Sequence, residues 1–177
     1  MRILFAVLIC TGLLAAQEPP TKKAMTLKEV LLEQLHTTHD KEEWYVPINI
    51  AVAGLTAEQA KWTDGHGNHS VGQLVNHLAF WNERVLAEVK GEKPQAFSGN
   101  NDETFNSFDS KSWAATVTRL DNVMKALEKL VEDADEAKLR ASASTMAHVG
   151  AHNAYHLGQI IYVRKLQGVW DPTNGVK

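Results

Sequence analysis

Apolar residues recur at helical spacing in four long stretches of the chain. The stretches cover residues 26 to about 45, 70 to 90, 113 to about 133, and about 145 to 167. Within each stretch the apolar residues are three or four positions apart, which places them on one face of a helix. No stretch of any length shows the alternation of apolar and polar residues that indicates a β-strand. The pattern therefore predicts an all-α fold, a four-helix bundle in which amphipathic helices bury their apolar faces together.

Local signals indicate where these helices begin and end. Residues 26–29 and 70–73 each have the Ser/Thr-x-x-Glu/Gln pattern of a capping box, which predicts helix starts at these positions. The same pattern at residues 56–59 predicts a short turn of helix that ends near Trp62. Gly168 is a C-terminal stop for the last helix.

Residues 91 to 111 are predicted to form a long loop. They are rich in Gly, Pro, Asn, Ser and Asp and contain only three large apolar residues, between Phe97 and Phe108. Loops of this length in compact domains often cover a functional site or are mobile. This segment, with Trp81 and Tyr155, is a candidate for the wall of a pocket. Packing into the core is the alternative for both Trp81 and Tyr155.

The N-terminal segment has the features of a secretory signal peptide. Arg2 gives a positive start, residues 3–14 are almost wholly apolar, and Ala15 and Ala16 are small. The apolar run is shorter than the roughly 20 residues of a membrane span. We expect residues 1–16 to be removed, which leaves a secreted or periplasmic protein with no stable membrane span. An uncleaved N-terminal anchor is the alternative.

Composition limits the partners and the kinds of metal site. The 177 residues include 18 basic and 21 acidic side chains, a net charge of −3. The chain thus lacks the basic excess that binds phosphate backbones, and we expect no nucleic-acid partner. The single cysteine, Cys10, lies in the expected signal peptide, so disulfides and multi-cysteine metal sites are excluded. Any metal must be held by histidines and carboxylates.

Three of the eight histidines lie on the predicted buried faces of two helices. His152 and His156 replace apolar residues in the stripe of the last helix, and His77 lies on or beside the buried face of the helix at 70–90. Three such imidazoles can converge on a divalent cation and leave coordination positions open, which is typical of catalytic sites. Core histidines bonded to backbone carbonyls or water are the alternative. His148 is expected to be solvated or at a gate.

The other four histidines carry weaker signals. We expect His36, His39, His66 and His69 to be surface or loop residues, and we keep His36 and His39 as candidate neighbours of a cavity because they lie on the first helix.

Several catalytic motifs are absent from the sequence. Asn153 follows His152, so there is no His-Glu-x-x-His motif with its general base. The chain also lacks Gly-x-Ser-x-Gly, the P-loop and the dinucleotide fingerprint. The motifs that usually carry out nucleophilic-serine catalysis or bind nucleotides are therefore missing.

Two motifs resemble those of DinB-like proteins. Residues 70–78 read Ser-Val-Gly-Gln-Leu-Val-Asn-His-Leu and are followed by an aromatic at Trp81, as in the second helix of that family. Residues 152–160 read His-Asn-Ala-Tyr-His-Leu-Gly-Gln-Ile, which is similar to the family signature, His-x-x-x-His followed by x-Gly-Gln-Ile. The resemblance covers residues 26 to 168, which leaves 169–177 as a C-terminal tail.

The resemblance implies a four-helix bundle that binds a divalent metal through His77, His152 and His156. Zn²⁺, Ni²⁺ and Fe²⁺ are the candidate ions, and Gln159 or Asn153 is the candidate support for the ligands. Family members include thiol S-transferases and proteins classed as metal-dependent hydrolases, so we expect a small-molecule substrate. The thiol cofactors of such transferases are cytosolic, and an exported member would meet little of them.

Two further features stay open at this stage. The resemblance allows a homodimer. The alternative to an enzyme is a non-catalytic bundle that binds a metal or a small ligand, and fold alone does not separate the two. A fourth protein ligand, such as His148, His39 or Asp40, would favour a closed structural site, whereas an open position would favour catalysis.

Overall fold

The computed structural model describes residues 23–175. The expected signal peptide at residues 1–16 lies outside this range, as do the last two residues of the predicted tail. Over residues 23–175 no helix is long and apolar enough to cross a membrane.

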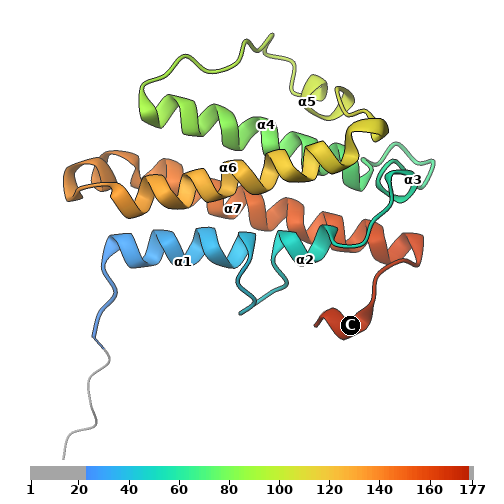
Figure 1. Ribbon diagram of the computed structural model, residues 1–177, viewed down its shortest axis with the longest axis horizontal. Helices are drawn as coiled ribbons and strands as arrows, with labels where there is room; N and C mark the ends of the chain where they lie inside the picture. The colour runs from blue at the N-terminus through green and yellow to red at the C-terminus, as the bar shows by residue number, and fades with distance from the viewer. Residues whose placement is uncertain (1–22, 176–177) are drawn as a thin grey trace, which may run out of the picture.

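Helices joined by loops make up the described part of the chain (Figure 1). The longer helices are α1 (Leu27–His39), α4 (Val71–Lys90), α6 (Trp113–Asp133) and α7 (Glu136–Gln167). The shorter ones are α2 (Ile48–Val52), α3 (Ala57–Ala60) and α5 (Asp102–Asn106), with 3₁₀ turns η1 (Ser110–Ser112) and η2 (Pro172–Asn174). Residues 23–175 contain no strand, which confirms the predicted all-α class.

The four longer helices pack around a shared core. Helix α1 lies against α6 and α7, and α4 lies against the same two helices. Figure 1 shows α4 along the top, α6 and α7 across the middle, and α1 followed by α2 below them. Each of the longer helices contributes fully buried side chains, among them Leu35, Leu78, Met124, Leu127 and Ile160. The apolar stripes read from the sequence are therefore the surfaces that these helices bury together.

The capping signals predict the helix starts correctly. The side chains of Thr26, Thr56 and Ser70 each accept a hydrogen bond from the backbone three residues later, and all three capping boxes are complete. Helix α7 ends at Gly168, whose φ of 74° is a left-handed conformation that glycine adopts without steric cost.

The first helix is shorter than predicted, because it ends at His39 and not near residue 45. Two threonines occupy its last turn, and their hydroxyls donate hydrogen bonds to backbone carbonyls of the preceding turn. Asp40, Glu42 and Glu43 follow, and negative charge is unfavourable at the C-terminal end of a helix dipole. Pro47 then precedes α2, a short helix that the sequence pattern did not indicate.

The last helix begins nine residues earlier than the predicted start at 145, since α7 starts at Glu136. The acidic residues 133–136 contain its N-cap. The Asp135 carboxylate accepts a hydrogen bond from the backbone N–H of Lys138, at 2.9 Å. Leu139 is the buried apolar side chain of the added turns, residues 136–144, so their periodicity is weak.

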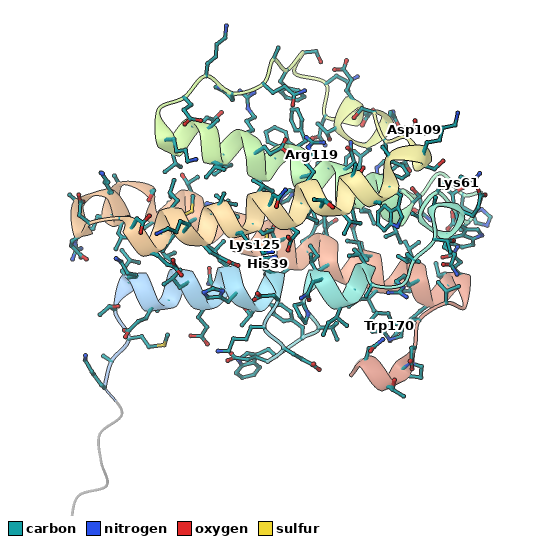
Figure 2. The ribbon with its side chains drawn as sticks, in the orientation of Figure 1. His39, Lys61, Asp109, Arg119, Lys125 and Trp170 are labelled. Carbon is teal, nitrogen blue, oxygen red and sulfur yellow. The ribbon has the colours of Figure 1, made fainter. Side chains whose placement is uncertain are left out.

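His39 is buried, and the expectation that it lies at the surface is wrong. Its side chain is 1% exposed and lies between two carboxylates of α6. Nδ1 donates to Glu128 Oε1 at 2.7 Å and Nε2 donates to Asp121 Oδ1 at 3.0 Å. Asp121 also binds Lys125, at 2.7 Å, where α1 faces α6 (Figure 2). Burial by itself lowers the pKa of His39, but the bonds to Glu128 and Asp121 outweigh it and raise the pKa.

The hydrogen bonds from His39 of α1 to Glu128 and Asp121 of α6 make the stability of the folded protein depend on pH. A raised pKa means that protonated His39 stabilises the folded chain below about pH 6.5, and that this contribution is lost as pH rises through the folded pKa. We expect Glu128→Gln to lower the free energy of unfolding by about 2 kcal/mol at pH 6 and by clearly less at pH 9. Urea unfolding of the metal-free protein at both pH values measures the difference.

A matched control for this substitution lies one turn along the same helix. Glu132 is exposed, so Glu132→Gln should change stability little at either pH. An equal loss of stability at pH 6 and pH 9 in the Glu128→Gln variant would show that His39 is not charged in the folded protein.

Candidate metal centre

The structure brings His77, His152 and His156 together where α4 faces α7. One ring nitrogen from each residue lies within 4.8 Å of those from the other two. The Nε2 atoms of His77 and His152 are 3.2 Å apart. His77 is 3% exposed and His156 is 6% exposed, while His152 is half-buried. Three imidazoles from two helices therefore share one small volume at the protein interior.

A threonine on α5 determines which nitrogen of His77 carries the proton. The Thr104 hydroxyl donates its only proton to the backbone carbonyl of Asn101, at 2.7 Å. Its oxygen is therefore an acceptor toward His77, and Nδ1–H of His77 donates to it at 2.6 Å. Nε2 of His77 is then the unprotonated nitrogen, and it faces Nε2 of His152 at 3.2 Å.

His156 is oriented in the same way by a residue of its own helix. Its Nδ1 donates to the Gln159 side-chain oxygen at 2.6 Å, so Nε2 is again the unprotonated nitrogen. Gln159, one of the two candidates for support of the ligands, therefore contacts a clustered histidine directly. Asn153, the other candidate, is fully buried in the core and bonds instead to Asn82, at 3.0 Å, and to the sulfur of Met124.

The three imidazoles are held in their neutral form. Burial lowers the pKa of His77 to about 3, and repulsion from His156, His152 and His69 adds to that effect. Burial, followed by repulsion from His156, lowers the pKa of His152 to about 4. Burial also lowers the pKa of His156, against the opposing effect of its bond to Gln159. Neutral imidazole is the form that coordinates metal ions.

The segment predicted as a long loop contains α5, and this helix covers His77. Phe105 of α5 is sandwiched between His77 and His69, with a ring-centroid distance of 3.9 Å to each and nearly parallel planes. His69 lies in the loop before α4, one of the two positions expected for it, and is half-buried in this stack. The side-chain amide of Asn76 donates to the backbone carbonyl of Thr104 at 2.7 Å and ties α5 to α4.

The sequence analysis missed two contacts at this site: the hydrogen bond between Thr104 and His77, and the stacking of His69 on Phe105. The signal that was available is the length of the 91–111 segment, which predicted a cover over a site without saying which side chain would contact it. Hydrogen bonds between residues 27 positions apart, such as His77 to Thr104, leave no periodic trace in a sequence.

Trp81 and Tyr155 differ in their relation to the centre. Trp81 is half-buried, and its indole N–H donates to the side chain of Asn101 at 3.2 Å. It also lines a small cavity together with His148 and His152. Tyr155 is 64% exposed, which excludes a role in core packing, and its ring lies 4.9 Å from that of His156.

The three-histidine group contains no fourth donor from the described residues. His148 is exposed, and its Nδ1 donates to the backbone carbonyl of Ser144 at 2.8 Å. His39 bonds to α6 carboxylates, while Asp40 belongs to a separate group with His36 and Glu128 on the α1–α6 side. The alternative donors named from the sequence therefore lie outside the three-histidine group.

The sequence is similar to one known protein family. A model of the DinB superfamily matches residues 48–160, more than half of the sequence, and this range includes all three clustered histidines. No curated protein matched the chain, and no solved structure did either. The extent of the family match leads to one conclusion: this chain belongs to the DinB superfamily.

Proposed function

We propose that this chain is an exported metal-dependent enzyme of the DinB superfamily. Its body would be a DinB-type four-helix bundle built from α1, α4, α6 and α7, and its ligands would be His77, His152 and His156. One observation carries the proposal: three neutral imidazoles converge from two helices, and two of them have Nδ1 bonded to an oxygen acceptor. Histidines that only pack in a core do not need to bring their ring nitrogens together in one place, as these three do.

The residues present fit a divalent ion. Metal-ligating histidines almost always donate their other ring N–H to an oxygen, which fixes the tautomer and raises the basicity of the ligand nitrogen. Thr104 and Gln159 supply such oxygens here. Imidazole ligands suit Zn²⁺, Ni²⁺ and Fe²⁺, and three protein ligands leave a coordination position for a small molecule.

The chain's own residues would hold the centre and keep it ready for a ligand. When bound, a divalent ion supplies Lewis acidity and lowers the pKa of a ligand that it carries. The lowered pKa values of His77 and His152 keep the ligand nitrogens free of protons at neutral pH. Phe105 covers one face of His77 and excludes water from it. The reaction type that we propose is hydrolysis or thiol S-transfer on a small-molecule substrate.

The export of the protein is part of the same proposal. It is supported by the basic start and apolar run of residues 1–16, and by the position of the only cysteine within them. An exported enzyme meets little of the cytosolic thiol cofactors, which favours the hydrolytic type of reaction.

Removal of two ligands tests the metal centre. We expect purified wild-type protein to contain about one divalent ion per chain by elemental mass spectrometry, and the double variant His152→Ala, His156→Ala to contain none, because one imidazole alone does not hold the ion. His148→Ala is the control on the same helix and should keep the metal. Stoichiometric metal in the double variant would contradict the assigned ligands.

The hydrogen bond from His77 to Thr104 gives a second test. Thr104→Val keeps the shape of the side chain but removes the acceptor for Nδ1–H, so we expect metal affinity to fall by about 10-fold to 100-fold. Thr104→Ser restores a hydroxyl and should restore most of the affinity. Competition with a chelator of known affinity measures both variants, and equal affinities for Thr104→Val and wild type would contradict an orienting role for Thr104.

A further inference from the structure

A small cavity opens directly on the histidine cluster. Its volume is about 230 Å³, and its walls include Trp81, Val85, Thr145, His148, Val149 and His152. His152 is the only member of the cluster among them, so the cavity adjoins the centre through that ring. The cavity lies between α4 and α7, which supply all of its walls.

The walls of this cavity select for an uncharged, apolar group. None of the residues that line it is Asp, Glu, Lys or Arg, and Trp81, Val85 and Val149 provide apolar surface. Trp81 is held in place by its hydrogen bond to Asn101 and by Phe97, whose ring lies 5.3 Å away. Apolar cavities of about 150 Å³ can bind benzene, so this space is large enough for an aryl ring or a branched alkyl group.

The wall also has polar side chains: Asn82 is bonded to Asn153 within the core, and His148 offers an acceptor to a ligand. The Nδ1–H of His148 donates to the Ser144 carbonyl, so Nε2 remains as a hydrogen-bond acceptor on a side chain that lines the cavity. A ligand with an N–H or O–H group beside its apolar arm would satisfy this acceptor. A carboxylate or phosphate arm would find no cation among the lining residues.

We propose that this cavity is a specificity pocket for the substrate. It receives an uncharged aryl or branched-alkyl arm of a small molecule whose heteroatom reaches the three-histidine centre. The inference rests on the metal centre proposed above and names the class of ligand that the centre takes. Val85 and Val149 are then specificity-determining residues, because they form the apolar surface beside the entering arm.

Binding of imidazole probes to the Co²⁺-loaded protein tests the pocket without an assay of activity. Imidazole, 4-phenylimidazole and 4-imidazoleacetate share one donor ring and differ only in the arm. We expect 4-phenylimidazole to bind about tenfold more tightly than imidazole, since its ring leaves water for an apolar wall. The charged acetate arm should give no gain. The visible absorption of Co²⁺ reports each titration.

Two substitutions should block the pocket and leave the metal in place. Val85→Trp fills it from α4, and Thr145→Trp fills it from the exposed rim of α7, where the core is not disturbed. Both should remove the preference for 4-phenylimidazole and keep the affinity for imidazole. Val30→Trp, at a 39% exposed position on α1, is the matched control and should keep the preference.

The outcomes separate the pocket from the metal centre. Wild-type protein that binds Co²⁺ but takes both neutral probes equally would overturn the pocket alone, as would a preference that survives both blocking substitutions. Wild-type protein that binds no Co²⁺ would overturn the metal centre and the pocket with it.

Discussion

A buried imidazole has two ring nitrogens, and the structure around this site depends on how both are satisfied. In His77 the Nδ1 proton is taken by Thr104, whose own proton goes to a backbone carbonyl of the same α5 segment. In His156 the Nδ1 proton is taken by Gln159. These two bonds leave Nε2 as the unprotonated nitrogen in each ring, and in His77 this atom faces His152. The position of α5 over α4 follows from the same constraint, because Thr104 must reach His77.

The fold places buried histidines in two contrasting electrostatic environments. Between α1 and α6, His39 is hydrogen-bonded to two carboxylates, which raise its pKa and favour the protonated ring that joins the two helices. Between α4 and α7, the hydrogen-bond partners of the clustered histidines are one another and neutral oxygens, so no carboxylate opposes the lowering of their pKa values by burial. The surroundings of the ring therefore favour the protonated form of histidine at one place and the neutral form at the other.

The sequence predicts the fold and the site to different depths. Helical spacing and capping boxes give the all-α class and the starts of α1, α4 and α6 nearly to the residue, because these signals are local. The ligand candidates could be found because His152 and His156 interrupt an apolar stripe. The burial of His39 could not be found from the sequence, because it depends on Glu128, which is distant in the chain. The contact of Thr104 could not be found for the same reason, because its partner is His77. The early start of α7 was missed because Asp135 reads equally well as an end or as a cap.

The most direct test of this account is the position of a bound ion in crystals of the full protein grown with Zn²⁺ and measured at the zinc absorption edge. The account predicts one anomalous peak about 2.0–2.1 Å from the Nε2 atoms of His77, His152 and His156, with no fourth protein ligand. A peak bonded to Nδ1 of His77 or His156, a fourth protein ligand, or no peak between α4 and α7 would contradict it.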